Sequence, residues 1–171
     1  FVGPARQRLY RVLDLPGAYS LTPTTLDEAI TRDFLLGRLA EEPPPDFIVC
    51  VVDATNLRLN LRLVVELRDI GVPMVVALNM SDLAANRGYK LDRARLEAEL
   101  GVPVVETVAV DAHGERKLVE QLETLPHPGR RQPLAWQEPS FSQIQDTQRE
   151  VRRILQASGY VEPLRKQALA R

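Results

Sequence analysis

The sequence predicts an α/β fold with a mostly parallel β-sheet flanked by helices. Short apolar runs rich in β-branched residues indicate strands, and segments with helical periodicity lie between them. Strands that run in the same direction need such crossover connections, because a tight turn cannot join them. The expected strands are residues 9–13, 47–53, 73–78 and 102–108.

The expected helices have recognisable start and stop signals. Thr25-Leu26-Asp27-Glu28 matches the capping-box pattern and opens a helix that continues to about residue 39, before the prolines at 43–45. Gly71 and Gly101 follow two later helices, at positions where a helix commonly ends. The later helices are expected at residues 60–70, 92–100 and 115–125.

The composition changes after residue 125. Residues 126–139 are rich in proline and predict a linker, whereas residues 140–157 place apolar and charged residues on opposite sides of a helix. The basic bias of this helix has two interpretations that stay open. It is either an ordinary solvated face or a juxtamembrane position on the cytoplasmic side, where basic residues accumulate. We therefore divide the chain into residues 1–125, a linker at 126–139 and a helical segment at 140–171.

Length and composition indicate one globular domain with a short appendage. The 171 residues are 44% hydrophobic and carry a formal net charge of -1, so there is no electrostatic argument for a nucleic-acid partner. Cys50 is the only cysteine and lies in an apolar run, where we expect a buried thiol in a reducing compartment. No apolar stretch approaches about 18 residues, the length expected of a membrane-spanning helix.

Polar residues follow two of the predicted strands, in an order typical of guanine-nucleotide-binding domains. Asp14-Leu15-Pro16-Gly17 follows residues 9–13, and Asn79-Met80-Ser81-Asp82 follows residues 73–78. Ligands of parallel α/β sheets bind at these carboxyl ends of strands. The Asp82 carboxylate can accept both the ring N–H and the exocyclic amine of guanine. Adenine would leave the carboxylate facing a lone pair, and an unpaired buried polar group costs roughly 1–3 kcal/mol.

The remaining polar positions fit the phosphates and the base carbonyl. Asp14 is placed to hold Mg²⁺ through a water, and Gly17 lets a backbone N–H approach the terminal phosphate. The end of the last predicted strand supplies backbone donors for the guanine carbonyl at Val108, Ala109 and Val110. Each motif alone is also typical of an ordinary turn or loop end. The prediction of a guanine-nucleotide site rests on the order of all three motifs along the chain.

Two features of nucleotide hydrolases are absent from the sequence. No G-x-x-x-x-G-K-[ST] loop occurs, and Ala18 follows Gly17 where a water-orienting glutamine would stand. His113 and His127 lack a metal-ligand spacing, and we interpret both as surface residues. The expected phosphate site is therefore incomplete.

The motifs resemble those of the ferrous iron transport protein B (FeoB) family. The run from Asp14 to Leu21 resembles its third GTPase motif and switch II, and four further segments resemble the same family. Met80 is the most discriminating residue, because most small GTPases have lysine there whereas this family has Asn-Met-x-Asp. The further segments are Val52-Asp53-Ala54-Thr55-Asn56-Leu57, Asn60-Leu61, Gly71-Val72-Pro73 and Ala77-Leu78-Asn79-Met80-Ser81-Asp82.

The resemblance implies a P-loop NTPase-like, small-GTPase-like fold and a slow, Mg²⁺-dependent GTPase. It implies GTP or GDP as ligand, and attachment to the protein's own transmembrane domain at the cytoplasmic face of the bacterial inner membrane, for Fe²⁺ transport. Asn79 to Asp82 would contact guanine, Asp14 to Gly17 would contact Mg²⁺ and the terminal phosphate, and 108–110 would be the fifth motif. K⁺ dependence and a homo-oligomer stay open.

Switch II of the family corresponds to residues 22–32, where Asp27 and Glu28 are candidate signalling residues. Carboxylates in the first turn of a helix also stabilise it through the helix dipole, and the sequence supports this interpretation equally.

The first motif and switch I of the family have no counterpart in the sequence, and we expect them upstream of Phe1. The strand that belongs with them normally lies between residues 9–13 and 47–53, so the sheet described by this sequence would have open edges. Two other functions stay open. One is an inactive GTPase-like docking module, and the other is a soluble TRAFAC-class GTPase acting on RNA, which the near-neutral charge disfavours.

Overall fold

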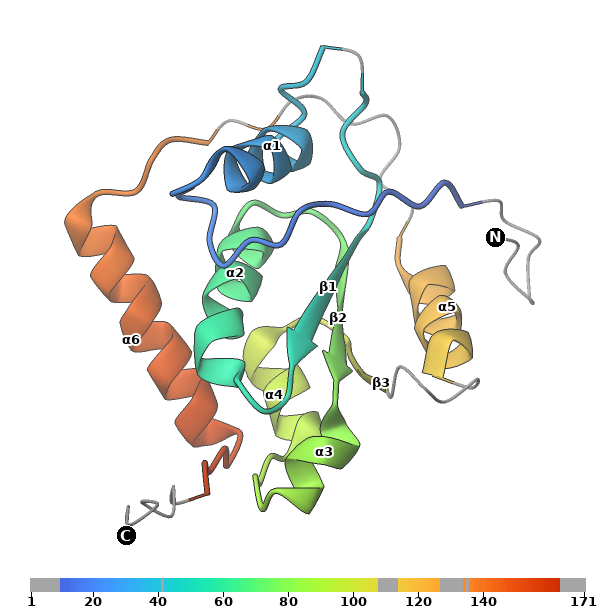
Figure 1. The fold of residues 1–171 in the computed structure, drawn as a ribbon, viewed down its shortest axis with the longest axis vertical. Coiled ribbons are helices and arrows are strands. Elements are labelled where there is room, and N and C mark those ends of the chain that lie inside the picture. The colour runs from blue at the N-terminus through green and yellow to red at the C-terminus, as the bar shows by residue number, and fades with distance from the viewer. Residues whose placement is uncertain (1–9, 41, 108–113, 127–133, 135, 164–171) are drawn as a thin grey trace, which may run out of the picture.

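The computed structural model describes residues 10–40, 42–107, 114–126, 134 and 136–163 (Figure 1). Its centre is a three-stranded parallel sheet in the order β1-β2-β3. The strands are β1 (Ile48–Asp53), β2 (Met74–Asn79) and β3 (Val104–Thr107). The helices are α1 (Leu26–Leu35), α2 (Leu57–Asp69), α3 (Ser81–Asn86), α4 (Arg93–Leu100), α5 (Gly114–Thr124) and α6 (Phe141–Ala157). The predicted α/β class is confirmed.

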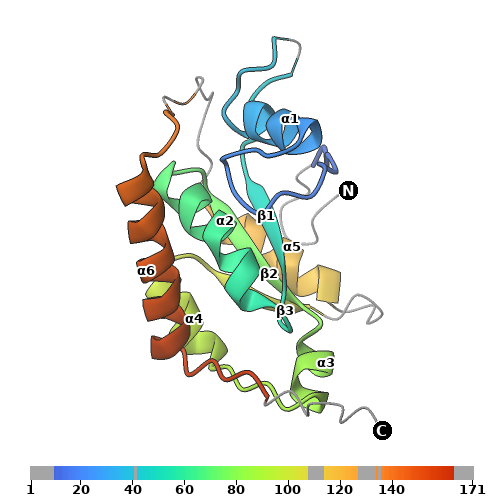
Figure 2. The same ribbon diagram turned by 60° about the vertical axis from the view of Figure 1, so that its left-hand side comes forward.

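The helices lie in layers on the two faces of the sheet. Contacts place α2 against β1 and α4 against β3, and α6 packs over both helices as an outer layer. Helix α5 covers β2 and β3 on the opposite face (Figures 1 and 2). In the described part of the chain, helices therefore lie against both edge strands on one face of the sheet, and against β2 and β3 on the other.

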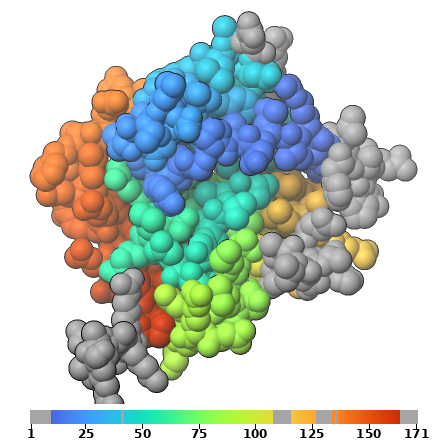
Figure 3. Space-filling view, viewed as in Figure 1, coloured from blue at the N-terminus to red at the C-terminus, as the bar shows by residue number. Residues whose placement is uncertain are grey.

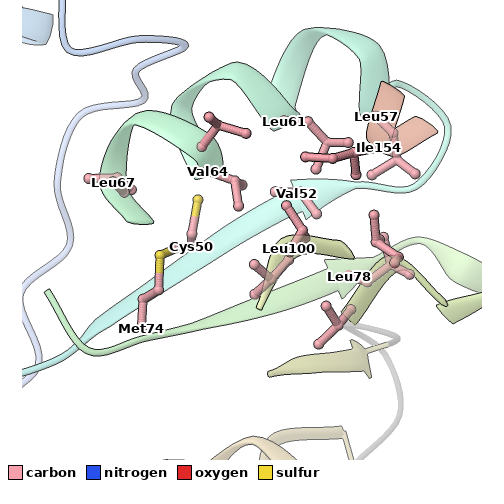
Figure 4. Packing of buried hydrophobic residues seen from close by; sticks show 14 of the residues in the cluster. Cys50, Val52, Leu57, Leu61, Val64, Leu67, Met74, Leu78, Leu100 and Ile154 are labelled. Atoms are coloured by element: carbon pink, nitrogen blue, oxygen red, sulfur yellow. The ribbon is translucent and has the colours of Figure 1, made fainter. Parts of the chain in front are cut away.

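The apolar core lies between the sheet and α2. Every residue of β2 from Met74 to Leu78 is buried, as expected of a central parallel strand. In β1 burial alternates, and Cys50 and Val52 point toward Leu61 and Val64 of α2 (Figure 4). Burial raises the pKa of the Cys50 thiol to about 12, so this side chain is a protonated, buried hydrophobe, as the sequence predicts.

The strand predicted at residues 9–13 is wrong for the part that the structure describes. Residues 10–13 have no strand conformation, and β1 pairs only with β2 among the described residues. The physical reason is that an apolar run forms a strand only beside a partner, and here no described strand adjoins the free edge of β1. The face of β1 that α5 does not reach is exposed at Val49 (38%) and Val51 (62%).

Helix boundaries differ from prediction where local polar contacts set them. Helix α2 begins at Leu57, not at residue 60, and α1 ends at Leu35 rather than near 39, with Gly37 in the left-handed region (φ 69°). Helix α3 was not predicted, because six residues are too few to show helical periodicity. Helix α6 is confirmed and opens with a capping box between Ser140 and Gln143.

No helix in the described part of the chain has both the length and the apolar character needed to cross a membrane.

Replacing Leu61 by alanine tests the core. This side chain is fully buried between α2 and β1, so Leu61→Ala should lower the free energy of unfolding by about 2–5 kcal/mol. Leu59 lies on the same helix but is 45% exposed, and Leu59→Ala should change it by no more than about 0.5 kcal/mol. Chemical denaturation of the two variants measures the difference, and equal losses would contradict this packing.

Candidate functional site

The carboxyl ends of the three strands are aligned in one row. Asp53 of β1 pairs with Asn79 of β2, and Asn79 pairs with Thr107 of β3. The segments that leave these strands therefore start side by side at one edge of the sheet, where parallel α/β proteins bind ligands. The register confirms that Asn79 stands at a strand end.

Asn79 carries a buried acceptor without a partner. Its side-chain Oδ1 is buried and accepts no hydrogen bond from any described residue, whereas its backbone carbonyl accepts from the Ala54 N–H at 2.9 Å. An unsatisfied buried acceptor costs roughly 1–3 kcal/mol, so native structures usually provide a donor. The amide is thus fixed by its main chain and has an oxygen ready to accept a donor from a ligand or another segment.

The residues after Asn79 turn sharply and then present Asp82 to solvent. Met80 has φ 59° and is the one non-glycine residue with positive φ in the described chain, a conformation that costs about 1–2 kcal/mol for an L-residue. Its side chain is 44% exposed. Asp82 lies in the first turn of α3, is exposed, and bonds to no other described residue. Its carboxylate is free to accept two donors.

A small cavity lies behind this turn. Its volume is about 130 Å³, and Ser81 lines it together with the residue after β1 and residues of β2, β3, α3 and the segment after α3. The other lining residues are Ala54, Leu78, Ala84, Ala85, Tyr89, Leu91 and Glu106. The cavity is next to the Asn79–Asp82 turn, since Leu78 and Ser81 both line it.

Asp53 has a structural role that sequence reasoning missed. Its Oδ1 accepts both the backbone N–H and the hydroxyl of Thr55, each at 2.7 Å, which forms an Asx turn from β1 into α2. This turn starts α2 earlier than the apolar periodicity predicts. The available signal was an aspartate at a strand end followed by threonine two positions later.

Asp14–Gly17 lies away from Asn79–Asp82 in this structure. The segment is held near the amino ends of the strands, because Arg11 pairs with Glu42 before β1 (2.8 Å) and the Leu21 N–H donates to Glu66 late in α2. Figure 3 shows this segment across the upper part of the molecule and α3 at the lower end. The structure therefore does not bring the two predicted motifs together.

Asp14 and Gly17 themselves are accessible. Both are exposed, Asp14 bonds to no other described residue, and a Cβ added at Gly17 would meet nothing within 4 Å. The described residues contain no group of three His, Cys, Asp or Glu side chains that could hold a metal. Asp14 thus fits a water-mediated partner of Mg²⁺ that is also held by phosphate oxygens, and it cannot hold the ion by itself.

The two carboxylates of the predicted switch lie in the first turn of α1. Glu28 accepts the backbone N–H (2.7 Å) and the hydroxyl (2.8 Å) of Thr24, while Thr25 accepts the Glu28 N–H at 3.2 Å. These bonds from Thr24 lower the pKa of Glu28. Asp27 is exposed beside it. Thr25 is the N-cap of α1, and Glu28 stabilises the start of the helix by holding Thr24, the residue before that cap, which supports the structural interpretation of Glu28.

The predicted third contact, at Val108, Ala109 and Val110, falls outside the described residues and stays a prediction. Thr107, which precedes it, pairs with Asn79.

A second cavity lies elsewhere in the described part of the chain. It has a volume of about 510 Å³, opens between α4, β3 and α5, and is lined by side chains of both charges. Its charged residues are Arg93, Glu97, Glu106, Lys117 and Glu120. Opposite charges that compensate one another do not select a charged ligand. The carboxyl ends of the strands, at Asp53, Asn79 and Thr107, are therefore the better candidate site.

The parallel sheet, its flanking helices and the strand-end motifs define a G domain, which has the P-loop GTPase fold. Comparison with known proteins agrees. The family model for ferrous iron transport protein B matches residues 3–122. A Porphyromonas gingivalis Fe(2+) transport protein A/Fe(2+) transporter FeoB fusion protein is 40% identical over 119 residues, which are 70% of this chain and 14% of that protein.

Solved structures give the same result. The FeoB G-domain from Methanococcus jannaschii is 40% identical, with a TM-score of 0.58 over 65% of this chain and 68% of that one. A mutant of S. thermophilus NFeoB bound to GDP is 41% identical, with a TM-score of 0.56 over 63% of this chain and 40% of that one. The chain belongs to the ferrous iron transport protein B family, as its motifs predict. It spans only 14% of the curated relative's length.

The lowered pKa of Glu28 makes the start of α1 pH-dependent. Because the folded-state pKa lies below the ordinary value of 4.5, the carboxylate stabilises the helix start above that pH. The stabilisation should be lost as the pH falls below 4.5 through the lowered pKa. Titration of the Glu28 side-chain carbonyl by NMR, with amide exchange at Thr24, measures this.

Glu28→Gln is the matched control, since glutamine keeps the shape without the charge. It should remove the change in Thr24 exchange below pH 4.5. A Glu28 midpoint at or above 4.5 in the wild-type protein would contradict the capping role.

Proposed function

We propose that this chain binds a guanine nucleotide at the carboxyl ends of β2 and β3. The observation that carries the proposal is the Asn79–Asp82 turn, in which a buried acceptor without a partner is followed by a free, exposed carboxylate. Asp82 accepts the ring N–H and the exocyclic amine of guanine. Asn79 holds the turn in place beside the edge of the base, and the apolar stem of Met80 covers one face of the base. Backbone donors at 108–110 contact the guanine carbonyl.

The phosphate end of the site requires a larger sheet. The free edge of β1 and the exposed side chains of Val49 and Val51 are the surface that an additional strand and helix would cover. We propose that this strand lies between β1 and residues 9–13, which then form a strand of their own. Asp14 and Gly17 would come to the same sheet edge as Asn79, and the added segment would supply the phosphate-binding loop.

The proposed activity is slow hydrolysis of GTP. Mg²⁺, when bound, neutralises charge that develops on the phosphates, and Asp14 orients one of its waters. Gly17 allows its backbone N–H to approach the terminal phosphate. The methyl group of Ala18 cannot orient a water, so we assign no general base to the described residues. We attribute the rate of GTP hydrolysis to positioning and electrostatics.

The proposed setting is the cytoplasmic face of a bacterial inner membrane. Curated relatives are named as Fe(2+) transporters, and a solved relative carries GDP, which supports a nucleotide-binding domain that serves Fe²⁺ transport. The partner would be the protein's own transmembrane domain, beyond α6. A net charge of -1 gives no support to an RNA-acting GTPase. K⁺ dependence and homo-oligomerisation stay open.

Base selectivity tests the role of Asp82. In the domain with its sheet completed upstream, Asp82→Asn should weaken GDP binding roughly five- to 150-fold, because about 1–3 kcal/mol of pairing is lost. The same change should favour XDP, whose carbonyl replaces the exocyclic amine and accepts from the new amide. A fluorescent-GDP competition titration with GDP and XDP measures both effects.

Asp146→Asn is the matched control, because Asp146 is an exposed carboxylate on α6 and should leave both affinities unchanged. A folded protein that binds no nucleotide would instead support the docking-module interpretation, and unchanged selectivity in Asp82→Asn would remove Asp82 from the site.

A further inference from the structure

Trp136, the only tryptophan of the chain, is held by two arginines from a distant part of the sequence. The guanidinium carbon of Arg32 lies 5.9 Å from the ring centroid, and that of Arg38 lies 5.7 Å from it. Arg32 belongs to α1, and Arg38 follows that helix. Both distances are within the range of cation–π attraction. The ring is therefore fixed against α1 and the segment that leaves it.

Two hydrogen bonds to main-chain carbonyls also join Leu134 and Trp136 to the segment at the end of α1. Arg38 Nη2 donates to the Trp136 carbonyl at 2.7 Å, and the Leu134 N–H donates to the Leu36 carbonyl at 2.9 Å. Leu134 and Trp136 are also partly buried against the core. We call these five residues the Trp136 clamp: Arg32, Leu36, Arg38, Leu134 and Trp136.

The clamp lies just before a helix that is anchored at only one end. Val151, Ile154 and Leu155 are buried in the second half of α6, whereas Phe141 in its first turn is 76% exposed. The salt bridges of α6 to neighbouring helices are also in the second half, Glu150 with Arg68 of α2 (3.0 Å) and Arg153 with Glu99 of α4 (2.6 Å). Among the described residues, no salt bridge and no fully buried side chain ties the first half of α6 to another helix.

Helix α1, which carries Arg32 of the clamp, also contacts the Asp14–Gly17 segment. The hydroxyl of Thr31, a buried residue of α1, donates to the Pro16 carbonyl at 2.8 Å. Thr31 immediately precedes Arg32, so one helix contacts both the predicted phosphate motif and the Trp136 ring. A displacement of α1 would therefore move both ends of this connection.

We infer that the Trp136 clamp couples the position of α1 to that of the first half of α6. Arginine suits this role, because its planar guanidinium can stack on an aromatic ring and keep donors for hydrogen bonds. Arg32 also donates to Asp33 at 2.9 Å, which orients its guanidinium over the ring. The use of the clamp to report nucleotide state to α6 rests on the proposed function.

The first experiment uses Trp136 as its own reporter in the nucleotide-free chain. Arg32→Lys/Arg38→Lys keeps both charges but removes the planar groups. Acrylamide quenching of Trp136 should rise, because lysine cannot stack a planar group on the ring while it donates to the Trp136 carbonyl. Arg58→Lys, at the start of α2 and paired with Glu162, is the matched control and should change nothing. Unchanged quenching in the double variant would overturn the clamp.

The second experiment measures coupling by amide hydrogen exchange. Trp136→Ala should accelerate exchange at residues 145–148 in the first half of α6 and leave residues 151–157 unchanged, since the second half has its own anchors. Arg32→Lys/Arg38→Lys should give the same pattern and serves if Trp136→Ala fails to fold. Equal acceleration along the whole helix, or none at residues 145–148, would overturn the coupling. Neither experiment uses a nucleotide, so failure of guanine binding would not change these outcomes.

Discussion

The parallel pairing of β1 with β2 is the constraint on which the rest of this structure depends. It runs over six residue pairs, from Ile48 with Met74 to Asp53 with Asn79, and the alternating burial of β1 fixes its register. A slip of β1 by one residue would exchange its two faces and turn Cys50 and Val52 out of the core. The same register puts Asn79 at the sheet edge between Asp53 and Thr107. Core packing thereby determines where the candidate site can form.

The free edge of β1 explains why only half of the candidate site is assembled. Hydrogen bonds of a strand are supplied by its neighbours, so residues 10–13 cannot become a strand until a neighbour is present. In the described structure this segment is held by Glu42 and Glu66 instead, and Asp14 stays away from Asn79. The turn from Asn79 to Asp82 is local to β2 and forms without that neighbour.

The sequence predicted the elements whose signals are local. Strands β1 and β3 lie within the predicted apolar runs, β2 extends one residue beyond its run to Asn79, and α6 follows its own capping box. Residues 10–13 failed as a strand because pairing is a non-local property. Helix α3 depends on the left-handed turn at Met80, and the start of α2 on the Asx turn at Asp53, which periodicity does not show. The Trp136 clamp joins residues 98 positions apart, and no local pattern indicates it.

The most direct test of the account is a map of where GDP binds. A ¹⁵N NMR titration of the domain with its sheet completed upstream would follow the Asn79 side-chain amide and the backbone amides of Asp82 and Thr107. These signals should shift with GDP and not with ATP if the turn after β2 selects the base. Shifts confined to the cavity between α4 and α5, at Arg93 and Lys117, would contradict it. Equal shifts with ATP would contradict it as well.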